Sequence, residues 1–229
     1  MAARVLDKVT IITGAGEGIG RTMAELFSRE GAKIVLAGRR REPLEAVGAA
    51  LRTDHIVVPT DITDEAQVAA MVRDSVAHFG HVDILLNNAA QPGTDKYLWE
   101  QTLENWNQNI AVNVTGPMLC TREVLKQSML ERKSGAIVNF SSIASWQGRE
   151  RKSHYCVSKS GLRLLTKVAA KEAGPYGVRV NCLVPGATKT DLLVRYLNRI
   201  AGEQNSTPEA VADKLYLQQQ ALKQINTAE

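Results

Sequence analysis

Residues 9–20 read Val9-Thr10-Ile11-Ile12-Thr13-Gly14-Ala15-Gly16-Glu17-Gly18-Ile19-Gly20, and this stretch decides the fold. Its β-branched start predicts a buried strand, and the amphipathic pattern after the glycines predicts a helix. Glycines let a backbone turn sharply and approach a pyrophosphate, whose charge is attracted by the free N–H groups of a helix N-terminus. At a strand-to-helix junction this pattern predicts a dinucleotide-binding loop, formed by Gly14, Gly16, Glu17, Gly18, Ile19 and Gly20. The alternative is a glycine-rich turn without a ligand.

The alternation of strand and helix patterns continues along the chain. Short runs rich in β-branched residues lie at 9–13, 33–37, 56–58, 83–87, 136–140 and 178–184. Helical patterns lie between and after them, at 19–29, 42–51, 64–79, 102–131 and 154–173. Apolar strands joined by helices are typical of a parallel sheet that is covered on both faces. We therefore predict an α/β fold, a doubly wound Rossmann sheet with six readable strands and helices on both faces.

The composition is that of an ordinary globular domain. The chain has 229 residues, of which 44% are hydrophobic and 23% charged, and its formal net charge is +4. This balance excludes a disordered chain, collagen and a coiled coil, and no apolar run is long enough to span a membrane. Cys120, Cys156 and Cys182 fit neither a disulfide framework nor a zinc site, which indicates a reducing compartment. We predict a single cytoplasmic domain over residues 1–229, with no metal and with neither nucleic acid nor a membrane as partner.

The end of the second predicted strand bears on the choice of dinucleotide. NAD-binding sheets place an acidic residue about 20 residues beyond the glycines, where it binds the ribose. Here that position is Gly38, and Arg39, Arg40 and Arg41 follow it. An arginine at this place can fork onto the 2′-phosphate of NADP. We therefore favour NADP(H), with Arg39 as its contact; the alternative is that the three arginines open a solvated helix.

Three polar residues in the second half of the chain can carry proton chemistry. Tyr155 and Lys159 are four residues apart on a predicted helix and therefore share one face. A lysine cation held close favours the phenolate, which lowers the pKa of a tyrosine toward neutrality. Ser142 follows the fifth predicted strand, and its hydroxyl can bind a carbonyl oxygen on which charge develops. Taken alone, the pair could be a surface helix pair and the serine a turn cap.

Asn113 lies inside a long helical pattern that also contains Pro117. Proline has no N–H, so the carbonyl four residues earlier, that of Asn113, lacks its helical donor. A bound water could take this carbonyl, and an ordinary proline kink is the alternative.

Together these residues resemble the short-chain dehydrogenase/reductase family over nearly the whole chain. Thr13-Gly14-x-x-x-Gly18-x-Gly20 is similar to its cofactor motif, and four residues lie where the family keeps its catalytic tetrad: Asn113, Ser142, Tyr155 and Lys159. The resemblance implies further cofactor contacts along the chain, from Asp61, Ile62, Asn88, Ala89, Tyr155, Lys159, Pro185, Gly186, Thr188 and Thr190. It also implies a water-mediated proton relay from Asn113 to Lys159. One departure is Ala90, where the family has glycine.

The resemblance implies an oxidoreductase that interconverts a carbonyl and a secondary alcohol with NADP(H), most similar to the 3-oxoacyl-ACP reductases. Its partner would be a small carbonyl or alcohol substrate, and the segments 102–131 and 154–173 would pair in a homodimer or homotetramer. Two alternatives stay open. One is an NAD-dependent alcohol or hydroxysteroid dehydrogenase, and the other is a non-catalytic dinucleotide-binding regulatory protein.

The substrate pocket is expected between residues 91–99, 143–154 and 187–197. These segments hold four aromatic residues that either pack a lid or touch the substrate: Tyr97, Trp99, Trp146 and Tyr196. The charged run 149–152 reads as a solvated loop, with attraction of an acidic or phosphopantetheine-linked substrate as the alternative. His154 points to another helix face than Tyr155 and is left out of the mechanism.

The C-terminal part departs from the pattern. Residues 188–225 are expected to form substrate-loop helices, and no strand follows them. The resemblance calls for a last strand and a short terminal helix, and residues 226–229 read as the start of a helix that Thr227 could cap. We therefore expect a fragment or a shortened chain whose sixth strand forms an exposed sheet edge.

Overall fold

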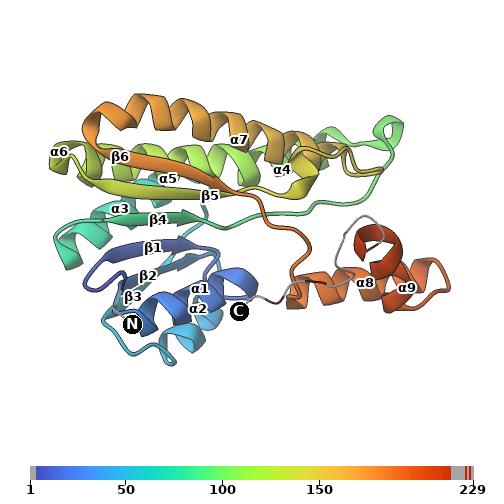
Figure 1. The fold of residues 1–229 in the computed structure, drawn as a ribbon, viewed down its shortest axis with the longest axis horizontal. Coiled ribbons are helices and arrows are strands. Elements are labelled where there is room, and N and C mark those ends of the chain that lie inside the picture. The colour runs from blue at the N-terminus through green and yellow to red at the C-terminus, as the bar shows by residue number, and fades with distance from the viewer. Residues whose placement is uncertain (1–3, 218–224, 226, 228–229) are drawn as a thin grey trace.

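The structure, a computed structural model, describes residues 4–217, 225 and 227. It contains a six-stranded parallel sheet in the order β3-β2-β1-β4-β5-β6 (Figure 1). The strands are β1 (Val9–Thr13), β2 (Lys33–Gly38), β3 (His55–Pro59), β4 (Ile84–Asn87), β5 (Gly135–Phe140) and β6 (Val178–Leu183). The order reverses between β1 and β4, where Ile11 lies beside Leu85, so a crevice opens at the carboxyl ends of these two strands.

Helices cover both faces of the sheet. The helices of the sheet region are α1 (Gly18–Arg29), α2 (Arg41–Gly48), α3 (Glu65–Phe79), α4 (Leu103–Ile110), α5 (Gly116–Val124), α6 (Leu130–Arg132) and α7 (Ser153–Ala173). The predicted helix 102–131 is one helical run interrupted by two π-helical turns, at Ala111–Thr115 and Leu125–Met129. Among the described residues no helix is both long and apolar enough to cross a membrane.

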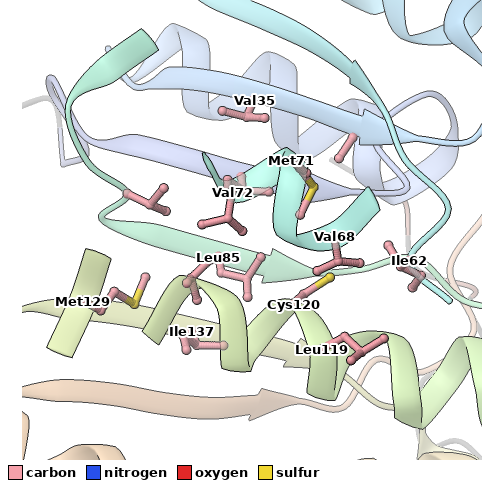
Figure 2. Packing of buried hydrophobic residues seen from close by; sticks show 14 of the residues in the cluster. Val35, Ile62, Val68, Met71, Val72, Leu85, Leu119, Cys120, Met129 and Ile137 are labelled. Atoms are coloured by element: carbon pink, nitrogen blue, oxygen red, sulfur yellow. The ribbon is translucent and has the colours of Figure 1, made fainter. Parts of the chain in front are cut away.

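Two apolar clusters hold the helices against the sheet. The larger joins the β1, β2, β4 and β5 side chains of one face to α3, α5 and α7, with Met71, Leu85, Cys120 and Ile137 at its centre (Figure 2). The smaller packs α1 and α2 on the other face, around Ile34, Leu36 and Leu44. Fully burying an aliphatic side chain contributes roughly 1.5–3 kcal/mol, so both layers are fixed by ordinary core packing.

A buried polar chain ties β4, β5 and α7 together. The Asn87 side-chain amide donates to Asn139 Oδ1 at 2.8 Å, and the Asn139 amide donates to Thr166 Oγ1 at 2.9 Å. Thr166 in turn donates to the Leu162 carbonyl. Each side-chain amide and hydroxyl donor of this network has a partner, whereas Asn87 Oδ1 has none among the described residues, so the network fixes the strands at the crevice at the cost of one unpaired buried oxygen.

The C-terminal segment leaves the sheet and forms α8 (Asp191–Glu203) and α9 (Pro208–Ala212), followed by a π-helical turn at Asp213–Leu217. These helices extend beyond the sheet (Figure 1) and share a small core of their own. In the described part of the chain β6 forms one edge of the sheet, and its side chains alternate between buried and accessible. Most of the expected helix start at 226–229 lies outside the described residues.

Candidate active site

The carboxyl ends of the strands border a cleft of about 960 Å³. Its lining includes every residue expected in the site except Gly20 and Asn113. The glycine loop and Arg39 lie with Asp61 and Ile62 at one end, and Ser142, Tyr155 and Lys159 lie at the other. The segment Pro185–Thr190 comes from the end of β6 and adds Pro185, Gly186, Thr188 and Thr190 to the wall. The structure thus brings together residues that are distant in the sequence.

The glycine loop is held tightly against the turn that follows β4. Gly14 has φ +66°, and a Cβ there would stand 2.9 Å from the Ala89 Cα. A Cβ on Gly20 would overlap the Gly14 carbonyl. The side-chain amide of Asn88 donates to the Thr13 and Gly14 carbonyls at 3.0 and 3.3 Å. The Thr13 hydroxyl accepts from the backbone amides of Asn88 and Ala89. These contacts explain why Gly20, which lies behind the loop, is needed for its shape.

This loop fits the pyrophosphate of a dinucleotide. It leads directly into α1, which begins at Gly18 with φ +56°. The free N–H groups of the first turn therefore lie at the end of the helix that borders the cleft. Glu17 makes no side-chain cap at this terminus. The first-turn donors are therefore left to an anion, and the glycines leave room for it.

The adenosine end of the cleft combines basic and acidic side chains. Arg39 and Arg40 are exposed and line the cleft beside Gly38. The Arg40 guanidinium lies 3.5 Å from Glu17 Oε2. Asp61 Oδ1 accepts from the Thr63 backbone amide and hydroxyl at 2.9 and 2.7 Å, which orders the turn after β3. No carboxylate stands at Gly38, where an NAD-binding sheet carries one.

Ser142 and Tyr155 meet at the other end of the cleft. Burial raises the pKa of Tyr155 above its ordinary value, and a hydrogen bond with the Ser142 side chain acts in the opposite direction. Ser142 also accepts from the Ala144 amide at 3.2 Å, which fixes its hydroxyl at the end of β5. A protonated phenol and an oriented hydroxyl therefore face the same space.

Lys159 does not bring the pKa of Tyr155 toward neutrality in this arrangement, because burial dominates and raises that pKa, so the expected lowering is wrong for the structure. Its Nζ donates to the Phe140 carbonyl at 2.8 Å and stands 5.8 Å from the centroid of the Tyr155 ring. Burial lowers the pKa of Lys159 itself to about 8. The reason is local: the ammonium is directed at the main chain of β5, where it is nearly removed from water.

Asn113 lies behind the cleft and not in its lining. Its side chain is fully buried, with Oδ1 accepting from the Gln91 amide at 2.8 Å and Nδ2 donating to the Gln91 carbonyl at 2.9 Å. Nδ2 also lies 3.1 Å from Ser158 Oγ. The Gly116 amide donates to the Ala111 carbonyl, so the helix is widened by a π turn just before Pro117. Asn113 therefore links the β4 loop, the π turn and α7.

An ionic cluster around a buried carboxylate, which the sequence did not reveal, lies at the wall of the cleft. The Asp95 carboxylate pairs with Lys152 and with Arg199 Nη2 at 3.2 Å, and it accepts from the Tyr196 hydroxyl at 3.2 Å. Burial raises the pKa of Asp95, but hydrogen bonds and charges from these partners outweigh it, so the pKa is lowered overall. Its four members come from the β4 loop, the start of α7 and α8. No sequence spacing relates them; the expected walls 91–99, 143–154 and 187–197 include Asp95, Lys152 and Tyr196 but not Arg199.

The run 149–152 is therefore not a solvated loop, as its charge pattern indicated. Lys152 is mostly buried against Asp95, and the Arg149 guanidinium covers the Tyr216 ring at 4.4 Å. Arg151 lies 5.5 Å from the Tyr97 ring centroid, and only Glu150 is exposed. Aromatic and carboxylate partners from other segments replace water around these cations.

The aromatic residues of the expected walls divide between cleft and surface. Tyr196 lines the cleft, whereas Trp99 is 81% exposed and stacks on Tyr97 at 4.8 Å. Trp146 is 64% exposed beneath the Arg163 guanidinium. His154 is buried: its Nε2 donates to the Pro92 carbonyl at 3.1 Å, its Nδ1 accepts from Gln101, and burial lowers its pKa.

Comparison with known proteins agrees with this geometry. A family profile described as short chain dehydrogenase matches residues 8–199. A 2,5-dichloro-2,5-cyclohexadiene-1,4-diol dehydrogenase of Sphingobium indicum is 40% identical over 196 residues, which cover 85% of this chain and 78% of that protein. An uncharacterized oxidoreductase of Staphylococcus aureus is 36% identical over 191 residues, which cover 83% of this chain and 82% of that protein.

Two solved structures are similar over almost the whole chain. Levodione reductase superimposes with a TM-score of 0.92 at 33% identity, covering 98% of this chain and 87% of that one. An NAD+-bound xylitol dehydrogenase gives a TM-score of 0.91 at 28% identity, covering 98% and 89%. The six-stranded Rossmann fold predicted from the sequence is confirmed. The protein is an oxidoreductase that acts on CH–OH groups with NAD(P), and it belongs to the short-chain dehydrogenase family.

Proposed function

We propose that this protein interconverts a ketone and a secondary alcohol with NADP(H) as its preferred coenzyme, in the manner of a ketoacyl reductase. One observation carries the coenzyme preference: Arg39 and Arg40 line the cleft beside Gly38, where a carboxylate would repel a 2′-phosphate. An arginine fork binds such a phosphate with two parallel hydrogen bonds. The cytoplasm is the proposed compartment, since Cys120, Cys156 and Cys182 are all free thiols.

Within this proposal Tyr155 is the general acid in reduction. Its raised pKa keeps the phenol protonated at neutral pH, so it can donate a proton to the alkoxide oxygen as this forms. Ser142 binds the same oxygen and orients the carbonyl. Lys159 holds the nicotinamide ribose and is the cation next to the phenol. The bound dinucleotide supplies or accepts the hydride.

Asn113 acts as a positioning residue in this scheme. Both hydrogen bonds to Gln91 fix the loop after β4, which walls the cleft, and the bond to Ser158 fixes α7 one turn from Tyr155. Its main-chain carbonyl, which Pro117 leaves without the usual helical donor, is where we place the water of the proton relay to Lys159.

An NAD-dependent alcohol dehydrogenase is the second candidate, and Glu17 favours it. Its carboxylate stands at the cleft with Arg40 and Arg195 each 3.5 Å away, so Arg40 is already paired. A negative charge in the glycine loop opposes a 2′-phosphate. The NAD+-bound relative has the same fold at 28% identity.

The choice can be tested with coenzyme kinetics on a panel of ketones. We expect wild type to prefer NADPH over NADH in kcat/KM, and Arg39→Asp to reverse the preference by loss of about 1.5–3 kcal/mol of charged hydrogen bonding. Arg41→Asp is the matched control, because Arg41 pairs with Glu45 outside the cleft and should keep the preference. A preference for NADH in wild type selects the second candidate, and a preference for NADPH that Arg39→Asp leaves unchanged refutes Arg39 as the contact of the 2′-phosphate. Tyr155→Phe must abolish turnover in either case.

We also propose that the protein is a homo-oligomer that pairs through α7. Val157, Leu164 and Val168 are spaced seven and four residues apart and are all exposed, which gives one apolar stripe along the helix. Leu164→Glu should therefore shift the sedimentation coefficient toward the monomer, and an unchanged coefficient would remove α7 from the interface.

A further inference from the structure

Positive charge collects on one wall of the cleft. Four basic side chains of the loop before α7 and of α8 line the cleft: Arg149, Lys152, Arg195 and Arg199. Three of them are paired. Lys152 and Arg199 share Asp95, Arg199 also reaches Glu203 at 2.5 Å, and Arg195 lies 3.5 Å from Glu17. Of these four, only Arg149 forms no ion pair with a carboxylate in the described part of the chain.

The contacts of Arg149 with the described residues are neutral and occupy only part of its hydrogen-bonding capacity. Its Nη2 donates to the Leu215 carbonyl at 3.1 Å, and the guanidinium carbon lies 4.4 Å from the Tyr216 ring centroid. A guanidinium has five N–H donors in a fixed fork. The side chain is held in place by main chain and ring, and among the described residues no carboxylate pairs with its charge and its remaining donors have no hydrogen-bond partner.

The charge of Arg149 also reaches the reacting group. Burial is the main influence on the pKa of Tyr155 and raises it, while the nearby Arg149 acts in the opposite direction. The same guanidinium contributes to the lowered pKa of Lys152, after burial and despite Asp95. Arg149 is therefore within electrostatic range of the phenol, and it lines the same cleft as Ser142 and Tyr155.

We propose that the substrate carries an anionic oxygen group, a carboxylate or a phosphate, which Arg149 binds while the carbonyl lies at Ser142 and Tyr155. This inference rests on the proposed function and names the substrate class of the same site. A guanidinium fork matches both groups, and the half-buried rings of Tyr196 and Tyr216 shield part of such a pair from water. A free oxo acid and a phosphopantetheine thioester would present the same chemistry.

The test compares charged ketones with neutral partners of the same length. The probes are oxo acids with the ketone two to five carbons from the acid end, their methyl esters, and a 3-oxoacyl thioester made with phosphopantetheine or with the uncharged N-acetylcysteamine. We expect wild type to prefer at least one anion over its neutral partner by about 10- to 100-fold in kcat/KM. A preference for the oxo acid over its methyl ester indicates a carboxylate, and a preference for the phosphopantetheine thioester over the N-acetylcysteamine thioester indicates a phosphate.

Arg149→Met should remove this preference through KM, with a smaller change in kcat. Arg163→Met is the matched control, because Arg163 makes the same two kinds of contact, to the Ser145 carbonyl at 3.2 Å and over the Trp146 ring at 4.3 Å, outside the cleft. The control should keep the preference. Equal turnover of anions and neutral partners by wild type overturns the inference, and so does a preference that Arg149→Met retains or that both variants lose.

A binding measurement separates this inference from the proposed function. If no ketone is turned over, the proposed function fails, and thermal unfolding with the oxo acids or phosphopantetheine thioester in the presence of NADP+ still tests Arg149. Stabilisation of wild type and of Arg163→Met by an anion, but not by its neutral partner and not in Arg149→Met, supports the site. Absence of that difference overturns it.

Discussion

At the scale of single residues, burial sets the charge states on which the proposed chemistry depends. Lys159 is 2% exposed, and desolvation brings its pKa down to about 8. The same effect raises the pKa of Tyr155. Below pH 8 the lysine is a cation and the phenol is neutral, so Tyr155 still carries the proton that it would donate. A resemblance in sequence places these two residues but does not show that Nζ donates to the Phe140 carbonyl.

The lowered pKa of Lys159 makes stability depend on pH in a defined direction. Between about pH 8 and 10.5 the unfolded chain keeps this proton and the folded chain loses it, so the free energy of unfolding gains about 1.4 kcal/mol per pH unit. In urea unfolding over that range, we expect the free energy of unfolding of wild type minus that of Lys159→Met to rise by this amount per pH unit. Lys167→Met, at an exposed position of α7, should show no such growth. A constant difference for Lys159→Met would contradict the buried ammonium.

At the scale of elements, the π turn between α4 and α5 carries Asn113 and lies just before Pro117. Pro117 lies in the first turn of α5, and the turn before it is held by a bond from Gly116 to Ala111. The widened turn carries Asn113, whose side chain fixes Gln91 and Ser158. The helix therefore departs from regular geometry at Asn113, the residue to which we assign the water of the proposed relay.

Pro117→Ala would restore an N–H that can donate to the Asn113 carbonyl. We expect the turn to become regular and kcat to fall by up to about 100-fold, because the proton relay loses its acceptor. Thermal stability should change little, since alanine is a good helix former. The measurement is the pH–rate profile with its solvent isotope effect. Unchanged profiles and isotope effects would leave the π turn with a purely structural role.

Features that depend on residues close in the sequence could be predicted, whereas contacts between distant segments could not. The strands and the glycine loop depend on local patterns, so β1 was predicted at its observed bounds, and Asp64 caps α3 where the predicted helix 64–79 begins. In the helix 102–131 Pro117 predicts an interruption near Asn113, but no residue there predicts the second π turn at Leu125–Met129. The Asp95 cluster joins three segments up to 104 residues apart, and nothing in any one of them indicates the others.

At the scale of the whole molecule, the protein consists of a sheet with two apolar layers and a smaller helical unit with its own core. Leu197, Ile200, Ala201, Val211 and Ala212 form that core, which is separate from both sheet clusters. Several of the contacts that join α8 to the sheet region are polar, from Tyr196 and Arg199 to Asp95 and from Arg195 to Glu17. A unit attached in this way can open while the sheet stays folded.

Opening of α8 and α9 as one unit can be measured by hydrogen exchange. Ile200 is 4% exposed, and Ile200→Ala should cost roughly 2–5 kcal/mol within the small core. We expect amides of α8 and α9 to exchange together and earlier than those of β1 and β4, and Ile200→Ala to accelerate only the helical unit. Ile137→Ala, in the sheet core, should instead accelerate exchange throughout the protein. If Ile200→Ala also accelerates β1 and β4, the small core unfolds only with the sheet, and access to the cleft would then require global unfolding or movement of α8 as a rigid body.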